Sequence, residues 1–250
     1  MSSVLNKTSL DSATSSVVAL VMILGVLAVC AGVWALIVVP EEIRTEYEIE
    51  ASSAVSALSD ITLMSEKMDD STVYFALPAG TIRLENCGEV YTEFGETVPL
   101  TTLVYSPGGK SSFGIMAGGV WRMDFGNAAW ILYPRIIFED ETLRFNLPVF
   151  SGNAAYGSSN PIPIGIEIKE HNPHTVSGDS IRISVTTDEE WAADLFETLF
   201  TETRYSYENL LDTDISQNGN RVTAEFSSKS GKTSLELDEK RYMIYTGDKI

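Results

Sequence analysis

Cysteine is scarce in this 250-residue chain, which contains only Cys30 and Cys87. Cys30 lies inside a long apolar run and Cys87 lies in a polar part of the chain, so the two thiols cannot meet unless Cys30 leaves its apolar surroundings. We therefore expect no disulfide bond within the chain. Two cysteines this far apart also exclude a cysteine zinc site and a small scaffold held together by disulfides.

Positive charge is also scarce, because 17 lysines and arginines stand against 35 aspartates and glutamates and leave a net charge of −18 at pH 7. Residues 1–16 carry only Lys7 and Asp11, so the acidic excess lies beyond the apolar run. Such a field repels phosphate backbones, which argues against nucleic acid as a partner. Most of these carboxylates are expected on a solvated surface.

Catalytic motifs are absent as well. The chain has no glycine-rich phosphate loop, no Gly-x-Ser-x-Gly elbow and no His-Glu-x-x-His. Its only histidines, His171 and His174, could reach one metal ion from a loop with Glu170 as a third ligand. Exposed histidines beside a proline turn are the commoner arrangement. The sequence therefore predicts no enzymatic activity, no cofactor and no metal site.

Three acidic clusters are the remaining source of chemistry. A pair of carboxylates could support glycoside hydrolysis, and a group of them could hold a calcium ion. The sequence does not place the clusters together, and an exposed turn is the expected setting of each. The clusters are Asp69–Asp70, Glu139–Glu141 and Asp188–Glu190.

A long apolar run begins soon after the N-terminus. Residues Val17–Val39 include no charged side chain, and as an α-helix they extend about 34 Å, against about 30 Å for the hydrocarbon core of a bilayer. The sequence predicts a transmembrane helix that anchors the chain in the lipid bilayer. Its anchor residues are Val17, Val18, Leu20, Ile23, Leu27, Trp34, Ile37 and Val39.

Three alternatives to a retained anchor fit this run less well. A cleaved secretory signal has a shorter apolar core and a small-x-small exit, whereas this run leads into Pro40. A lipoprotein signal ending at Cys30 requires a small residue where Val29 stands. A buried helix of a soluble fold is rarely uncharged over such a length.

The flanks of the run predict its orientation. Lys7 and the free amino terminus lie on the short side, and the other flank opens with acidic residues from Glu41 onward. By the positive-inside rule, we expect a single-pass protein of the cell membrane with a cytoplasmic N-terminus and an extracellular C-terminal domain.

The helix is expected to continue beyond the membrane as an amphipathic extension over residues 40–70. Its apolar or small positions are three or four residues apart, which places them on one face of an α-helix. This face should pack on the domain that follows. The positions are Ile43, Tyr47, Ala51, Ala54, Leu58 and Ile61.

Beyond Asp70 the apolar residues alternate with polar ones, and glycine, proline, asparagine and serine separate the runs. Short runs of this kind predict a mainly antiparallel β-sandwich or barrel-like domain over residues 71–250. The predicted strands are Thr72–Leu77, Thr81–Leu84, Glu89–Phe94, Pro99–Tyr105, Ser112–Met116, Val120–Phe125, Ala129–Tyr133, Arg135–Phe138, Leu143–Phe150, Ile162–Lys169, Ile181–Thr186, Arg221–Phe226, Thr233–Leu237 and Tyr242–Tyr245.

One helix is predicted among the strands, over Glu189–Glu202. Thr187 followed by Glu190 is a capping-box pattern, and the apolar residues after it fall on one helical face. Packing on a sheet is the expected role of this face, and a ligand-binding stripe is the alternative. The face comprises Trp191, Leu195, Phe196, Leu199 and Phe200.

The order of these features resembles archaeal type IV pilin-like proteins: a short polar leader over residues 1–16, an apolar helix over 17–39, a helical extension and a β-rich domain. Local patterns are similar to an uncharacterised family of pilin-like, single-pass archaeal surface proteins. These patterns are Gly118–Trp121, Leu147–Phe150, and Trp191-x4-Phe196-Glu197 followed by Arg221–Thr223.

The resemblance implies an apolar helix that first holds the subunit in the bilayer and can later pack against its equivalents in a filament. Like subunits or other surface proteins are then the implied partners. Many such precursors carry a lysine or arginine with a glycine or alanine just before the apolar helix, whereas this leader reads Leu10–Ser15 without that pair. Ala13 is the residue that would precede a cleavage.

Together these features predict an α+β fold in which a transmembrane helix, an amphipathic helical stalk and a β-rich domain with one packed helix follow each other. The expected function is that of a membrane-anchored, structural cell-surface protein without catalytic activity. The alternatives are an anchored extracellular hydrolase that uses acidic residues and a ligand-binding ectodomain.

Overall fold

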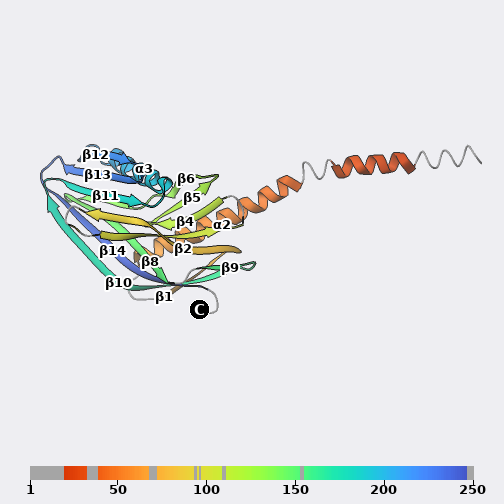
Figure 1. Ribbon diagram of the computed structural model, residues 1–250, viewed down its shortest axis with the longest axis horizontal. Helices are drawn as coiled ribbons and strands as arrows, with labels where there is room; N and C mark the ends of the chain where they lie inside the picture. Colours follow the sequence, from red (N-terminus) through yellow and green to blue (C-terminus); the bar gives the residue numbers. More distant parts are fainter. Residues whose placement is uncertain are drawn as a thin grey trace, which may run out of the picture. The chain divides into compact units, whose positions relative to one another are not determined.

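A computed structural model describes residues 20–32, 39–67, 72–92, 95, 97–108, 111–152 and 155–246 (Figure 1). The chain divides into two compact units, Met1–Glu50 and Ala51–Ile250. The first contains a helix over residues 20–32 and the beginning of helix α2 (Val39–Lys67). No helix within the described ranges is both long and apolar enough to cross a membrane. The predicted transmembrane helix Val17–Val39 lies partly outside those ranges, which omit 17–19 and 33–38.

The second unit consists mainly of strands, with the end of α2 before them and one further helix, α3 (Glu190–Ser206), among them. The strands are β1 (Thr72–Leu77), β2 (Gly80–Thr92), β3 (Thr97–Ser106), β4 (Ser111–Met116), β5 (Gly119–Asp124), β6 (Asn127–Leu132), β7 (Ile136–Glu139), β8 (Thr142–Gly152), β9 (Tyr156–Ser158), β10 (Ile162–Gly178), β11 (Ile181–Thr187), β12 (Leu211–Asn218), β13 (Arg221–Ser228) and β14 (Thr233–Thr246).

These strands form two curled, largely antiparallel sheets (Figure 1). The five-stranded sheet has the order β1-β10-β14-β8-β7, in which β14 and β8 run parallel. The nine-stranded sheet has the order β12-β13-β11-β2-β3-β4-β5-β6, with β9 paired to β2. The chain passes between the sheets six times, at β1–β2, β6–β7, β8–β9, β9–β10, β10–β11 and β13–β14. The predicted α+β class with mainly antiparallel strands is confirmed.

The second half of α2 belongs to the core of the β-rich unit. Its buried residues pack in one apolar cluster with side chains from both sheets, including β1, β3, β4, β10 and β14. The predicted amphipathic face is confirmed where it is described, and its first two positions, Ile43 and Tyr47, have side chains outside the described residues. The buried positions are Ala51, Ala54, Leu58 and Ile61.

A second apolar cluster surrounds α3. The helix contacts β6, β11, β12 and β13, and because β6 and β12 are the two end strands of the nine-stranded sheet, this sheet curls around it. Four of the five predicted face positions are buried, as expected. Trp191 is the exception, since it is only half-buried and lies against Trp121 with ring centroids 4.9 Å apart.

The start of α3 differs from the prediction. The helix begins at Glu190 with Glu189 at the N-cap position, and no side chain caps it. Thr187 is instead the last residue of β11, and its hydroxyl lies 2.8 Å from the carbonyl oxygen of Glu189 and 3.2 Å from that of Asn220. The capping-box prediction is wrong because Thr187 is held in the sheet.

Several strands are longer than the sequence pattern predicts. β2 joins two predicted strands across a bulge beside Cys87, and β14 joins the last two. The pattern also misses β9 and β12. In β12 only Leu211 is buried, so this strand lacks the apolar alternation from which strands are predicted.

Candidate functional site

The apolar helix over residues 20–32 is the first candidate site. Every side chain in it is exposed, and the large apolar ones are between 57% and 69% exposed. A helix that is apolar on all sides is normally buried in a larger core or in a membrane. Of the predicted anchor residues, Leu20, Ile23 and Leu27 lie in this helix, Val39 is the first residue of α2, and Val17, Val18, Trp34 and Ile37 lie outside the described residues.

The two histidines lie in β10, where a loop was expected. Pro173 is accommodated because this end of β10 pairs only with β14 among the described strands, so the missing proline N–H is not required. His171 and His174 are three residues apart, which turns their side chains to opposite faces of the sheet. The predicted turn is therefore wrong, and the two histidines cannot share a metal ion.

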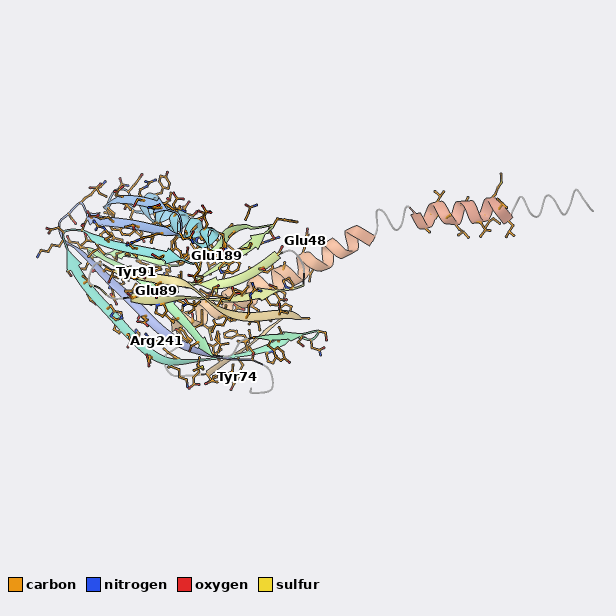
Figure 2. All side chains as sticks on the ribbon, viewed as in Figure 1. Glu48, Tyr74, Glu89, Tyr91, Glu189 and Arg241 are labelled. Atoms are coloured by element: carbon orange, nitrogen blue, oxygen red, sulfur yellow. The ribbon has the colours of Figure 1, made fainter. Side chains whose placement is uncertain are left out.

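Glu239 on β14 is a buried carboxylate, with 4% of the residue exposed. Arg241 Nε donates a hydrogen bond to it over 2.6 Å, and His174 Nε2 lies 3.2 Å from its other oxygen. The hydrogen bond to Glu239 raises the pKa of Arg241, whose guanidinium also lies 3.5 Å from Glu170. Figure 2 labels Arg241. The buried charge is thus paired within the sheet, which is the condition for a stable buried carboxylate.

The acidic clusters do not come together. Asp188–Glu190 lies at the start of α3, and Glu139–Glu141 lies at the turn after β7. Phe138 packs against Tyr207, just beyond the other end of α3, with ring centroids 6.1 Å apart. The two clusters are therefore separated by about the length of α3, roughly 25 Å, which is too far for a carboxylate pair that cleaves a glycosidic bond. Asp69–Asp70 lies outside the described residues.

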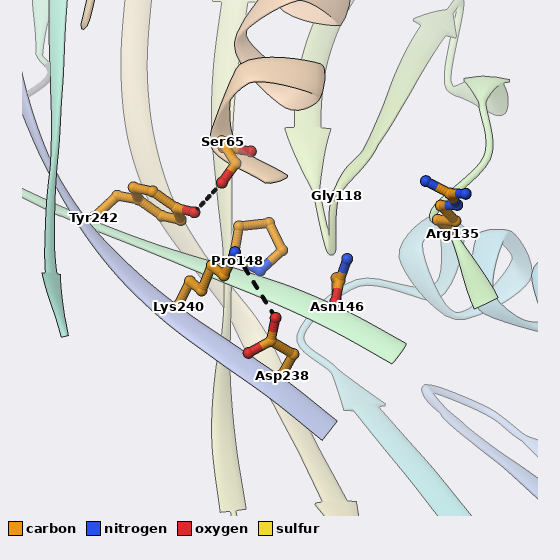
Figure 3. A pocket seen from close by; sticks show the side chains of 8 residues that line it. All are labelled: Ser65, Gly118, Arg135, Asn146, Pro148, Asp238, Lys240 and Tyr242. Carbon is orange, nitrogen blue, oxygen red and sulfur yellow. Dashed lines mark hydrogen bonds and ion pairs between the residues drawn. The ribbon is translucent and has the colours of Figure 1, made fainter. Parts of the chain in front are cut away.

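A small pocket lies where the end of α2 meets the strands (Figure 3). At its wall, the Tyr242 hydroxyl donates to the carbonyl oxygen of Ser65, and Lys240 Nζ lies 3.8 Å from Asp238 Oδ2. The enclosed space is no larger than a single water molecule requires. It therefore has no room for a substrate, and its polar contacts fix the end of α2 to β14.

Both cysteines are free, as predicted. Cys87 is buried, and its Sγ donates to the carbonyl oxygen of Leu100 over 3.2 Å. Burial, with the nearby charges of Asp188 and Glu85, raises the pKa of the Cys87 thiol to about 12. Since the thiolate is the reactive form, Cys87 is inert at neutral pH.

Two surface hollows beside β7 have no counterpart in the sequence analysis. One is bounded by Tyr133, Glu202 and Tyr207, and the other by Phe138 and Leu210. Their walls come from the β6–β7 connection, β7, the β7–β8 turn, the second half of α3 with the chain that follows it, and the β13–β14 turn. No local pattern marks such a site, because these segments meet only in the folded chain.

Within the described ranges, no group of three or more histidine, cysteine or acidic side chains is placed to hold a metal ion. Comparisons of the chain with models of protein families, with curated proteins and with solved structures find no match. The function therefore has to be inferred from the residues and geometry of the chain itself.

Proposed function

We propose that this chain is a membrane-anchored, pilin-like structural protein of the cell surface without catalytic activity. The observation that carries the proposal is the contrast between its two helical segments. The helix over residues 20–32 exposes apolar side chains on all sides, whereas Ala54, Leu58 and Ile61 of α2 are completely buried among strands. One segment requires an apolar environment outside the chain, and the other is fixed to a folded head.

In this proposal the anchor is the whole run Val17–Val39, as one transmembrane helix. Lys7 favours a cytoplasmic N-terminus, and the acidic domain beyond residue 40 is then extracellular. The two curled sheets form a barrel-like head around the end of α2. The separation of the acidic clusters and the paired state of Glu239 favour a structural role over an anchored hydrolase.

External protease on intact cells is expected to remove the domain after Pro40 and leave an N-terminal fragment in the membrane. The physical reason is that Val17–Val39 is long enough to cross the hydrocarbon core and carries no charge. Tags at the two ends, followed on blots of the membrane and soluble fractions, measure both topology and anchoring.

A matched variant sharpens this test. In this variant lysine replaces Leu20, Ile23 and Leu27. Inserting a lysine at the centre of a bilayer costs about 2.5–3.5 kcal/mol, so the variant should leave the membrane pellet. A wild-type chain that is already soluble would contradict the anchor. Digestion that occurs only after lysis would reverse the orientation.

Association between copies is expected to use one face of the apolar helix. Gly25, Ala28 and Gly32 are three and four residues apart and so share a face, and the two glycines meet no other atom at the position of a Cβ. Small residues of this kind allow two helices to approach closely in a membrane. Cys30 lies on roughly the opposite side of the helix.

Oxidative cross-linking in membranes tests this face. A chain with Ala28→Cys and Cys30→Ser should form a reducible dimer, because its thiol lies at the close contact. The wild-type chain, with its thiol on the far side, should form much less. Cys87 does not interfere, because its pKa of about 12 keeps it protonated at pH 8. Absence of a dimer with either cysteine would contradict self-association through this helix.

A further inference from the structure

We propose that the two hollows beside β7 form one binding site for an extended polypeptide segment that carries lysine or arginine side chains. We call the pair of hollows the β7 groove. Their volumes are about 260 and 310 Å³. The larger hollow reaches the lower end of the range of natural ligand sites, about 300–1,000 Å³, and the two together lie within it. This inference concerns the head alone and does not depend on the anchor.

The β7 groove follows the free edge of a short strand. β7 is the last strand of the five-stranded sheet and, among the strands that the structure describes, pairs only with β8. On its other side the Tyr207 hydroxyl donates to the carbonyl oxygen of Ile136 over 3.5 Å, and the Tyr207 ring packs on Phe138. Tyr207 therefore stands between the two hollows, which lie at the two ends of β7. A ligand that fills both must be extended along the strand.

The apolar part of the β7 groove is aromatic and accessible. Tyr133 is 42% exposed at one end, and Leu210 is 52% exposed at the other. Tyrosine rings attract ammonium and guanidinium groups through their π faces, and the methylene stems of lysine and arginine cover apolar surface well. These walls therefore suit a basic side chain better than a short acidic or purely polar one.

The charge of the β7 groove also favours a basic ligand. Asp140 and Glu202 have no ion-pair partner among the described residues, and the Glu141 carboxylate accepts a hydrogen bond from the neutral hydroxyl of Ser230 over 3.0 Å. Glu139 is paired, since it lies 3.5 Å from Arg144. Among the described residues of its wall the cation is Lys229, which is already engaged, since its Nζ donates to the carbonyl oxygen of Glu208 over 2.7 Å and lies 3.4 Å from Asp212. The site therefore offers negative charge to a ligand.

Charge also decides between occupants. A second copy of this chain would bring 35 acidic residues against 17 basic ones to an acidic groove. An anionic membrane surface is repelled for the same reason. A basic segment of a different protein is attracted, and its charges add to the rate and selectivity of association.

The test uses the full-length chain in detergent micelles and the labelled peptide Lys-Val-Lys-Val-Lys with blocked ends. The groove variant combines Asp140→Asn, Glu141→Gln and Glu202→Gln, which remove charge but keep shape. Asp140 has a φ of 50°, and asparagine tolerates that backbone conformation. The control variant combines Asp60→Asn, Glu85→Gln and Asp179→Asn, which remove the same charge at exposed sites elsewhere.

The groove variant should bind the peptide roughly tenfold more weakly, since an exposed ion pair contributes about 0.2–1 kcal/mol and three are lost. The control variant should bind it nearly as well as the wild type. A double variant with Tyr133→Ser and Leu210→Ser should also bind the peptide more weakly, because these substitutions remove the apolar walls. Equal loss in both charge variants would reduce the interaction to general attraction and overturn the site. Tighter binding of a neutral oligosaccharide such as chitopentaose than of the peptide would also overturn it.

Discussion

Replacing Phe196 with alanine is expected to lower the free energy of unfolding of the β-rich unit by about 3–5 kcal/mol, a large share of the ~5–15 kcal/mol that holds a typical domain together. Phe196 is fully buried on α3 and lies edge-on to Trp130, with ring centroids 6.2 Å apart. On its other side the Phe196 ring packs against Phe200, also with ring centroids 6.2 Å apart. The substitution therefore leaves a cavity between α3 and the sheet that curls around it.

Thermal unfolding of the full-length chain in micelles, followed by circular dichroism, measures the effect. A loss of this size corresponds to a fall in Tm of roughly 6–20 °C for a domain of about 200 residues. Tyr205→Ala is the matched control, since Tyr205 is an aromatic residue of the same helix that is 60% exposed. It should change stability by no more than about 0.5 kcal/mol. Equal Tm values for the two variants would show that α3 is not part of the core.

Trp191 is a poorer probe of this core than its place in the sequence pattern indicates. Its spacing with Leu195 and Phe196 predicts a buried position, but it lies in the first turn of α3 and is only half-buried. Its large ring packs at a tilt against that of Trp121, at the margin of the cluster. We expect Trp191→Ala to cost about 1–2 kcal/mol, because part of the side chain stays in contact with water in the folded chain.

The sequence predicts α2 well because one period governs the whole segment. Ala51, Ala54, Leu58 and Ile61 are spaced for one helical face, and all four are buried. This agreement needs no knowledge of the partner surface, since any core would bury the same stripe. The alternating strands of the nine-stranded sheet are predicted for the same reason.

Prediction fails where the partner strand decides the structure. Pro173 indicates a turn by local rules, yet it lies in β10, because β14 supplies the pairing and the other edge is free of described neighbours. Thr187 has the sequence of a helix cap, yet a contact with the carbonyl of Asn220 keeps it in β11. Neither neighbour can be identified from the local sequence.

The candidate sites also differ in whether the local sequence predicts them. The apolar run Val17–Val39 is visible in the sequence because a membrane anchor depends only on local composition. The β7 groove is not, because Tyr133 and Tyr207 lie far apart in the chain and come together only through the packing of α3 beside β7. A surface built by tertiary contacts leaves no periodic pattern.

Replacing Gly88 with alanine is expected to destabilise the β-rich unit strongly. Gly88 has a φ of 140°, and a Cβ there would lie 2.1 Å from the carbonyl oxygen of Thr186. The residue pairs with Leu100 of β3 on one side and Thr187 of β11 on the other, beside the bulge of β2. Because the obstacle is backbone, relief requires β2 and β11 to separate in the middle of the nine-stranded sheet.

We expect Gly88→Ala to cost more than about 3 kcal/mol and to reduce the amount of folded protein in cells. Gly126→Ala is the matched control, since Gly126 has a φ of 89° but no atom within 4 Å of the added Cβ. It changes the unfolded chain in the same way and should cost only about 1–2 kcal/mol, the strain of a left-handed alanine. Denaturant unfolding of both variants separates the cost of the left-handed backbone conformation from the cost of the clash with Thr186. If they lost equal stability, conformation alone would account for the effect, and the close approach of β2 to β11 would have to be wrong.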